Sequence, residues 1–265
     1  MASDCNSGAM SPDTDHSHDE VVRRSFDRQV GLFSGPDSPF ARRPEGALAW
    51  LEPLADDMLV LDVACGAGHA SETVAPRVRE VVGIDLTVTL LELGAKRLRE
   101  AGITNVLLQE GNAEALPFVD ESFDLVFCRS ALHHMANPAQ AVAEMVRTCR
   151  PGGRVVLSDL LAPSPEERDT FDRLHQLIDP SHVRAFLENE LGTVLPDTVT
   201  LTYGEATSSR FPIDIAITDQ SDVDALFAAF RAELDGGERT GFDPRLEDGK
   251  FVVSFQSCVV HGTRQ

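Results

Sequence analysis

The most constraining feature of this sequence is a regular alternation, starting at residue 58, of short apolar runs with segments of helical periodicity. The apolar runs have strand length and are nearly continuous, which is typical of strands buried on both faces. Such strands, when they alternate with helices, form a parallel sheet covered on both sides. The predicted strands are residues 58–64, 80–85, 105–111, 123–129, 154–160, 198–203 and 250–260. The sequence therefore predicts a doubly wound α/β domain with a mostly parallel, seven-stranded sheet.

The segment before this core changes character near residue 20. Residues 1–20 contain no lysine or arginine and are rich in serine, aspartate and proline. Such a segment cannot bury enough apolar surface to offset its chain entropy, so we expect a disordered acidic tail in which His16 and His18 are solvated. Residues 21–33 have apolar side chains at helical spacing and predict an amphipathic helix. A second short helix is predicted at 44–54.

Charge and cysteine usage limit the partners and the compartment. Acidic residues outnumber basic ones by 43 to 23, which gives a formal charge of −20. This charge repels phosphate backbones and anionic lipids, so we expect neither nucleic acid nor a membrane as a partner. The five cysteines contain no CxxC motif, and the first residues lack the pattern of a signal peptide. We therefore expect a reducing, cytoplasmic location.

The glycine-rich turn after the first strand is the clearest indication of a ligand. Residues 60–71 read VLDVACGAGHAS, and Gly66 and Gly68 let a ligand approach the backbone at the start of the next helix. Asp85 ends the second strand, where its carboxylate can accept hydrogen bonds from both hydroxyls of a ribose. No lysine follows the glycines, which excludes a phosphate-binding loop, and Ser71 stands where a dinucleotide fingerprint requires a third glycine.

The DxxCGxG pattern, followed by an acid at the end of the next strand, resembles motifs I and II of class I S-adenosylmethionine-dependent methyltransferases. Residues 111–159 resemble, nearly end to end, the branch of that family that acts on small molecules and includes the methyltransferases of ubiquinone and menaquinone biosynthesis. FDRQV at 26–30 resembles the lid helix of that branch, and DPSHVRAF at 179–186 resembles part of its substrate cap. The resemblance implies a Rossmann-like enzyme that uses S-adenosyl-L-methionine and a small-molecule acceptor.

The same resemblance divides the chain into a tail and one domain. After the tail at 1–20, a single methyltransferase domain is expected over residues 21–265. Its expected parts are lid helices at 21–57, a cofactor-binding core at 58–160, a helical substrate cap at 161–193, and C-terminal strands with a helix at 194–265.

The resemblance also implies which residues hold the cofactor. Residues of the glycine turn would meet its methionine end through backbone atoms, Asp85 would hold the ribose hydroxyls, and Leu86 would pack on the adenine. Position 64 is alanine where the family often has glycine, and Asn112 stands where aspartate is usual, although its amide oxygen can still accept a hydrogen bond from an adenine amino group. The implied cofactor-binding residues are Ala64, Gly66, Gly68, Asp85, Leu86, Asn112, Ala113 and Arg129.

Methyl transfer from a sulfonium depends mainly on alignment, but a hydroxyl or carbon acceptor also needs a base to take its proton. The candidate catalytic residues are His134 after the fourth strand, Asp159 at the end of the fifth, and His182 in the cap. His134 has an alternative structural role, in which it fixes its loop through a hydrogen bond. His133 and His175 are expected to be structural. We expect no metal site, because the candidate ligands lack short spacing.

The acceptor is constrained mostly by exclusion. Methyltransferases that modify amide or adenine nitrogens usually carry an Asn/Asp-Pro-Pro-aromatic motif after the fourth strand, whereas residues 128–131 read CRSA. Arsenic methylation would require several cysteines near the transfer site, and only Cys65 and Cys128 are close by motif. O- or C-methylation of a small molecule is therefore favoured. Two alternatives stay open, which are a non-catalytic S-adenosylmethionine-binding protein and an NAD-dependent oxidoreductase, and the sequence leaves the oligomeric state open.

Overall fold

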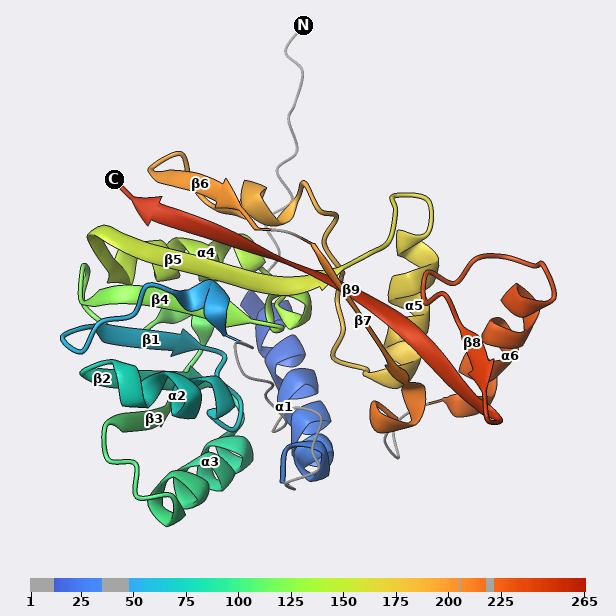
Figure 1. The fold of residues 1–265 in the computed structure, drawn as a ribbon, viewed down its shortest axis with the longest axis horizontal. Coiled ribbons are helices and arrows are strands. Elements are labelled where there is room, and N and C mark those ends of the chain that lie inside the picture. The colour runs from blue at the N-terminus through green and yellow to red at the C-terminus, as the bar shows by residue number, and fades with distance from the viewer. Residues whose placement is uncertain (1–11, 35–47, 205, 218–221) are drawn as a thin grey trace, which may run out of the picture.

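The computed structural model describes residues 12–34, 48–204, 206–217 and 222–265, which contain one nine-stranded sheet and six α-helices (Figure 1). The strands are β1 (Leu59–Val63), β2 (Glu80–Asp85), β3 (Val106–Glu110), β4 (Phe123–Arg129), β5 (Cys149–Leu161), β6 (Val199–Tyr203), β7 (Thr207–Pro212), β8 (Arg245–Glu247) and β9 (Lys250–Arg264). The helices are α1 (Pro12–Ser34), α2 (His69–Val74), α3 (Val88–Glu100), α4 (Pro138–Thr148), α5 (Arg168–Ile178) and α6 (Val223–Leu234).

The strand order confirms the predicted doubly wound fold. Seven strands follow the order β3-β2-β1-β4-β5-β9-β6, while β7 and β8 pair with β9 outside this path. Strands β1 to β5 are parallel to one another, and β9 runs antiparallel to both β5 and β6. The chain order reverses between β1 and β4, so the carboxyl ends of these strands flank the crevice where open α/β sheets bind ligands.

Both faces of the central strands β1 and β4 are largely buried, as the apolar runs predict, whereas β3 at the edge of the sheet is only partly buried. Alternate residues of one strand point to opposite faces. Val60 and Phe127 pack with residues of α2 on one face, whereas Leu61 and Cys128 pack with residues of α4 on the other. Cys149 also lies in the core. None of the helices in the described ranges is long and apolar enough to cross a membrane.

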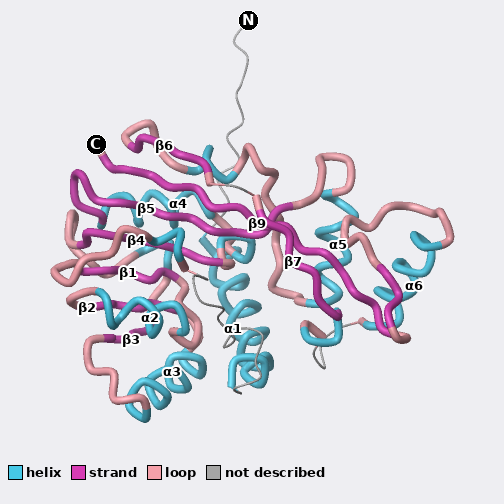
Figure 2. Tube along the Cα trace, in the orientation of Figure 1, coloured by secondary structure: helices cyan, strands magenta, loops and turns pink. Residues whose placement is uncertain are grey.

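A second lobe is attached to the sheet through β9 (Figures 1 and 2). We call it the cap lobe, and it consists of α5, α6, β7, β8 and the first half of β9. Phe171 of α5, Phe230 of α6 and Phe251 of β9 lie in its separate apolar core. The sequence predicted a cap of residues 161–193 only, whereas the described cap core also contains residues up to Val253.

The predicted helical spacing after α5 does not form a helix. Val183, Phe186 and Leu187 suggest helical periodicity, but the chain there is irregular up to a short 3-10 turn at Leu191–Val194. The backbone N–H of Val183 instead donates to the carbonyl oxygen of His133 at 2.9 Å, and Phe186 forms a parallel bridge with Leu161. Tertiary hydrogen bonds therefore replace those of a local helix.

The expected tail boundary is wrong, because α1 begins at Pro12 and not at residue 21. His18 donates from Nε2 to the carbonyl oxygen of His134 at 2.7 Å, and Asp19 accepts a hydrogen bond from Asn112 at 3.0 Å. His18 is thus anchored, although solvation was expected from the composition. Residues 1–11 and the side chain of His16 lie outside what the structure describes.

The helix expected at 44–54 is only partly testable. Its first residues, 44–47, lie outside the described ranges. In the rest, the structure has a 3-10 turn at Ala49–Leu51 and no α-helix.

Helix α3 rests directly on the loop between β1 and α2 because it has a glycine at the contact. A Cβ atom on Gly94 would lie 2.4 Å from the carbonyl oxygen of Ala67 and 2.8 Å from Leu108 Cδ1. Arg97, one turn further along α3, donates to the same Ala67 oxygen at 2.6 Å. The absence of a side chain at Gly94 therefore sets how closely α3 approaches the loop.

We expect Gly94→Ala to destabilise the protein by about 1–3 kcal/mol, because the backbone oxygen of Ala67 cannot move without shifting the loop. Gly31→Ala in α1 is the matched control, since nothing lies within 4 Å of its Cβ position and alanine favours a helix by about 1 kcal/mol. Urea unfolding followed by circular dichroism should shift in opposite directions for the two variants. Stabilisation by both would contradict the close packing of α3.

Candidate functional site

The predicted cofactor-binding residues all lie at one edge of the sheet, at or just after the carboxyl ends of β1 to β4. Hydrogen bonds connect neighbouring parts of this edge. The N–H of Cys65 donates to the Ile84 carbonyl oxygen, and that of Gly111 donates to the Asp85 carbonyl oxygen, both at 3.0 Å. The residues at this edge are Ala64, Gly66 and Gly68 after β1, Asp85 and Leu86 at the end of β2, Asn112 and Ala113 after β3, and Arg129 at the end of β4.

The turn after β1 has left-handed backbone at three of its predicted positions. The φ angles are +55° at Ala64, +55° at Gly66 and +69° at Gly68. Ala64 is strained there, because a Cβ atom clashes with its own backbone in this region, and this explains why glycine is the usual residue at this position. A Cβ atom on Gly66 would have Leu90 Cδ1, 3.9 Å away, as its nearest neighbour. One side of the Gly66 backbone is therefore open to close approach.

Asp85 is fixed by two backbone N–H groups. Its Oδ2 atom accepts from Gly66 at 2.7 Å, and its Oδ1 atom accepts from Thr87 at 2.8 Å. Burial raises the pKa of this carboxyl, while the hydrogen bonds from Thr87 and Gly66 oppose that rise. The carboxylate is thus held next to the glycine turn, in the place predicted for a ribose-binding acid.

Two side chains near the turn have structural roles. The hydroxyl of Ser71 donates to Oδ2 of the buried Asp62 at 2.6 Å, so the residue that departs from the dinucleotide fingerprint anchors α2 to β1. Burial, followed by the charges of Asp62 and Asp85, raises the pKa of the Cys65 thiol well above its usual value. Cys65 therefore stays protonated near neutral pH and is a poor nucleophile.

Helix α1 lies across this edge, between the sheet and α5 (Figure 1). Its hydrogen bonds reach β2, β3, α2 and α3 and so span the predicted cofactor-binding residues. These bonds connect Asp19 with Asn112 (3.0 Å), Arg23 Nε with the Leu86 carbonyl oxygen (3.3 Å), Asp27 with Thr89 (2.6 Å), and the Phe33 carbonyl oxygen with His69 Nε2 (3.2 Å). The helix that resembles a family lid is thus seated over the site.

Asp159 is fully buried and saturated with hydrogen bonds. It accepts from Nδ1 of His133 at 2.5 Å and from three backbone N–H groups, of Ala131, Leu132 and Leu160. Burial alone would raise the pKa of Asp159, but the interaction with His133 and these bonds outweigh it, so the pKa lies below its usual value. Asp159 thereby shapes the turn that carries both His133 and His134.

His134 is buried beside that turn and has one ring nitrogen engaged. Its Nδ1 atom lies 3.0 Å from the hydroxyl of Ser181, which donates to Asp179 at 2.6 Å. Its Nε2 atom has no hydrogen-bond partner among the described residues. Burial, reinforced by the charge of His133, lowers the pKa of His134 to about 3. The ring is therefore neutral near neutral pH.

His182 and His175 form a parallel stack in the cap, with ring centroids 4.2 Å apart and 5° between the planes. His182 donates from Nε2 to Asp172 at 2.7 Å, and the Nδ1 atoms of both rings are buried without a partner in the described part of the chain. Burial lowers the pKa of each ring. Within the described ranges, His, Cys, Asp and Glu form no group arranged to hold a metal ion.

The structure brings His134 and His182 together, with ring centroids 6.4 Å apart. Asp159 contacts the neighbouring His133 and the turn that precedes His134. Sequence reasoning missed the residues that support them, which are Ser25, Asp172, Asp179 and Ser181. A signal was present for two of these, because Asp179 and Ser181 open the DPSHVRAF segment. Nothing in the local sequence indicates that Ser25 reaches the cap.

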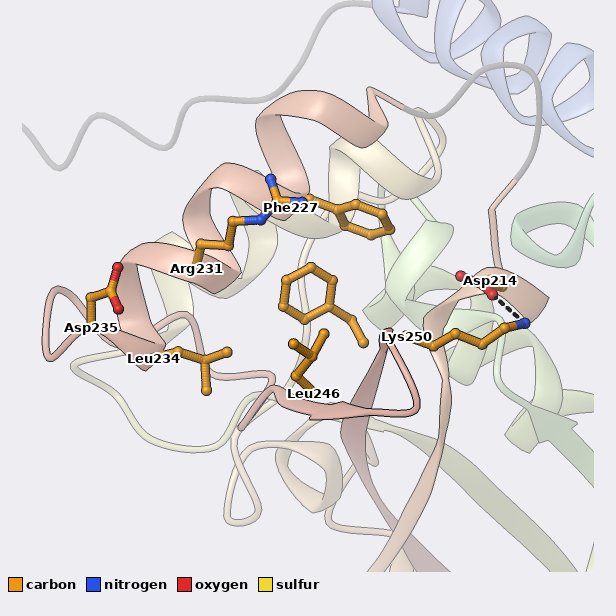
Figure 3. A pocket seen from close by; sticks show the side chains of 9 residues that line it. Asp214, Phe227, Arg231, Leu234, Asp235, Leu246 and Lys250 are labelled. Atoms are coloured by element: carbon orange, nitrogen blue, oxygen red, sulfur yellow. Dashed lines mark ion pairs between the residues drawn. The ribbon is translucent and has the colours of Figure 1, made fainter.

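A separate hollow of about 560 Å³ lies in the cap lobe between α6 and the β8–β9 hairpin (Figure 3). Phe227 and Leu246 contribute apolar walls, and Lys250 pairs with Asp214 at its rim at 2.8 Å. None of the predicted site residues lines it. It is therefore distinct from the candidate site.

The neutral histidines predict a loss of stability in acid. Because burial lowers the pKa of His175 well below its usual value, the unfolded chain takes up a proton below about pH 6.5 that the folded protein does not. Stability then falls with pH by up to about 1.4 kcal/mol per pH unit for each such histidine.

We expect His175→Phe to reduce this slope by up to about 1.4 kcal/mol per pH unit, a limit that is approached as the pH falls from 6.5 to 5. The phenyl ring suits the site, because Phe171 and Phe255 already pack against His175 with centroids 5.6 and 5.5 Å away. Urea unfolding at several pH values, compared with the unsubstituted protein, measures the slope. An unchanged slope would mean that His175 is protonated in the folded protein.

Comparisons with known proteins agree with this geometry. Residues 61–157 match a family model described as a methyltransferase domain. YcgJ of Bacillus subtilis, an uncharacterised methyltransferase, is 43% identical over 126 residues, and the match covers 47% of this chain and 50% of YcgJ. The chain thus spans about half the length of this curated relative in the sequence alignment.

Two further comparisons extend over more of the chain. A demethylmenaquinone methyltransferase of Clavibacter sepedonicus is 32% identical over 172 residues, which cover 64% of this chain and 68% of that protein. The crystal structure of YcgJ superposes with a TM-score of 0.75 and 27% identity, over 83% of this chain and 97% of YcgJ.

A structure of geranyl diphosphate methyltransferase in complex with S-adenosylmethionine shares the fold alone, with a TM-score of 0.57 and 19% identity, over 83% of this chain and 84% of that one. Four observations point to the same family: the glycine turn, the acid at the end of β2, the strand order and these relatives. The chain belongs to the class I methyltransferase family.

Proposed function

We propose that this protein is an S-adenosyl-L-methionine-dependent methyltransferase that methylates a small-molecule acceptor at oxygen or carbon. The observation that carries the proposal is the position of Asp85. Its carboxylate is held by the N–H groups of Gly66 and Thr87 beside a turn in left-handed backbone. The same edge carries every residue that the family resemblance implies for the cofactor.

The residues at this edge fit S-adenosylmethionine. The open side of Gly66 suits the methionine end, and Asp85 can accept hydrogen bonds from the two ribose hydroxyls. Leu86 offers an apolar surface, and Asn112 offers an amide for the adenine edge. When bound, the cofactor supplies an electrophilic methyl group. The role of the protein is to hold the acceptor in line with that group. Such orientation lowers the activation free energy by about 7–11 kcal/mol.

Of the three candidate catalytic residues, His134 suits a general base best. It is neutral near neutral pH, and its Nε2 atom is free of hydrogen bonds within the described ranges. Asp159 has its oxygens engaged by four donors, and His182 has Nε2 engaged by Asp172 and Nδ1 buried. We therefore assign proton acceptance to His134, support of the β4–α4 turn to Asp159, and packing of the cap beside His134 to the fully buried ring of His182.

The relatives support a small organic molecule as the acceptor. One is named for demethylmenaquinone and shares 32% identity, which favours a quinol or phenol whose ring carbon or hydroxyl receives the methyl group. Phe26 of α1 packs edge-on against His134, with centroids 5.1 Å apart, and adds an aromatic surface beside the proposed base. Transfer of labelled methyl groups to a panel of quinols, phenols and carboxylic acids tests this acceptor class.

The alternatives make different predictions. A non-catalytic S-adenosylmethionine-binding protein would bind the cofactor and transfer no methyl group to any acceptor in the panel. An oxidoreductase would bind a nicotinamide cofactor in calorimetry and would not bind S-adenosylmethionine.

Free thiols are present at Cys65, Cys128, Cys149 and Cys258, which supports a reducing, cytoplasmic compartment.

We expect Asp85→Ala to weaken S-adenosylmethionine binding by about 1–3 kcal/mol, because the ribose hydroxyls lose charge-assisted hydrogen bonds. Isothermal titration calorimetry measures the change. Asp57→Ala is the matched control, because Asp57 is exposed in a loop away from the carboxyl ends of the strands.

Asp85→Asn separates charge from geometry, since the amide oxygen can still accept from a backbone N–H. It should bind more weakly than the unsubstituted protein and retain the native circular dichroism spectrum. Unchanged affinity in a folded Asp85→Ala variant would refute the assignment of this edge to the cofactor.

We also expect α1 to act as a lid that closes over the bound cofactor. Arg23→Ala combined with Asp27→Ala removes the hydrogen bonds to Leu86 and Thr89, at about 0.5–1.5 kcal/mol each. Backbone amides of α1 should then exchange about 5- to 150-fold faster, since local opening becomes correspondingly easier. Glu20→Ala, which removes an exposed ion pair with Arg24 within α1, is the control.

Hydrogen–deuterium exchange with mass spectrometry measures both proteins with and without S-adenosylmethionine. The cofactor should slow exchange in α1 of the unsubstituted protein. A cofactor that binds and leaves exchange in α1 unchanged would rule out the lid.

A further inference from the structure

Three hydrogen bonds converge on one carboxylate oxygen between α1 and the cap. Asp179 directly follows α5 and is buried. Its Oδ1 atom accepts from the hydroxyl of Ser25 on α1 at 2.8 Å. The same atom accepts from the backbone N–H of Ser181 at 2.9 Å and from the Ser181 hydroxyl at 2.6 Å. This carboxylate therefore ties the helix that covers the cofactor edge to the cap.

The number of available hydrogens determines the direction of each bond. Ser181 has one hydroxyl hydrogen, which goes to Asp179 because an ionised carboxylate only accepts. The Ser181 oxygen then accepts from Nδ1 of His134 at 3.0 Å. The neutral His134 ring thus carries its hydrogen on Nδ1 and its lone pair on Nε2. On α1, Gln29 donates to Ser25 at 3.0 Å and leaves the Ser25 hydrogen for Asp179.

The other titratable groups around His134 are engaged elsewhere. His133 donates to Asp159, and His182 donates to Asp172. His18 of α1 contacts the backbone carbonyl oxygen of His134 and not its ring. Among the described residues, the path through Ser181 to Asp179 is therefore the one that sets the tautomer of His134.

We propose that Asp179 is a positioning residue that couples the seating of α1 to the tautomer and orientation of His134. The inference rests on the proposed function, in which Nε2 of His134 takes the proton of the acceptor. With α1 seated, Ser25 holds the carboxylate and Phe26 packs against the His134 ring. With α1 displaced, both contacts are lost, Asp179 is hydrated, and the ring is free to exchange tautomers.

The coupling also addresses the charge that forms during catalysis. A proton taken by Nε2 turns His134 into an imidazolium, which burial disfavours. Burial also raises the pKa of Asp179, but the attraction of His134 when that ring is charged and the hydrogen bonds from Ser181 and Gln29 outweigh this effect, so the carboxyl remains ionised. Its negative charge, two hydrogen bonds away, favours the imidazolium while the lid excludes water.

The tautomer can be measured directly and needs neither cofactor nor acceptor. In ¹⁵N-histidine NMR spectra, His134 of the unsubstituted protein should be the Nδ1–H tautomer. Ser181→Ala and Asp179→Ala should convert it largely to the Nε2–H form, and Ser25→Ala should give a mixture. Ser34→Ala is the matched control, because within the described residues this α1 serine donates to the carbonyl oxygen of Val30 and not to the cap. Unchanged signals in a folded Ser181→Ala variant would overturn the proposal.

Turnover tests the coupling once an acceptor is identified. Asp179→Ala should lower kcat about 10- to 100-fold with S-adenosylmethionine affinity unchanged, which is less than the ~10²–10⁴-fold loss expected for His134→Ala. Ser25→Ala should lower kcat in the unsubstituted protein and have no further effect in Asp179→Ala, because both act through one carboxylate. Additive effects of the two substitutions would overturn the coupling.

Failure of the coupling and failure of the proposed function give different results. If S-adenosylmethionine does not bind in calorimetry but the tautomer follows the variants, the proposed function is wrong and the hydrogen-bond path stands. If the cofactor binds and methyl transfer occurs, but the His134 tautomer is the same in the Asp179→Ala and Ser181→Ala variants as in the unsubstituted protein, only the coupling is wrong. The Ser25→Ala and Ser181→Ala variants keep the test valid even if Asp179→Ala does not fold.

Discussion

The turn between β1 and α2 is the constraint on which the rest of this structure depends. Its backbone is left-handed at Ala64, Gly66 and Gly68, the carboxylate of Asp85 accepts a hydrogen bond from Gly66, and α3 packs against Ala67 at Gly94. A side chain at position 94 would move α3, and a side chain at position 66 would fill the open side of the turn. The packing of α3 and the access of a ligand therefore both depend on this short loop.

Helix α1 connects the two lobes through polar contacts and not through a shared apolar core. Asp19 and Arg23 reach the sheet edge, and Ser25 reaches the cap. The hydrogen bonds of Asp19 and Arg23 are only partly buried and contribute about 1 kcal/mol each, whereas the bond from Ser25 to Asp179 is buried. This combination suits the proposed lid, which would admit a cofactor and an acceptor and then exclude water.

The sequence predicted the proposed cofactor-binding part of the site better than the proposed acceptor-binding part. The cofactor side follows from the chain order, because the carboxyl ends of parallel strands lie at one edge and place Asp85 beside Gly66 whatever the details of packing. The acceptor side could not be derived in this way. His134 and His182 were candidates, but their separate hydrogen bonds, to Ser181 and to Asp172, join residues 47 and 10 positions apart.

The sequence by itself determined the alternation of strands and helices, the parallel sheet, and the glycine turn with its acid, because each depends on local periodicity or on short spacing. Only the tertiary structure decided that α1 begins at Pro12 and that Val183 and Phe186 pair with other segments instead of forming a helix. It also decided that one oxygen of Asp179 serves both α1 and the cap. These features depend on hydrogen bonds between distant residues, which satisfy backbone and side-chain groups in ways that local propensity does not encode.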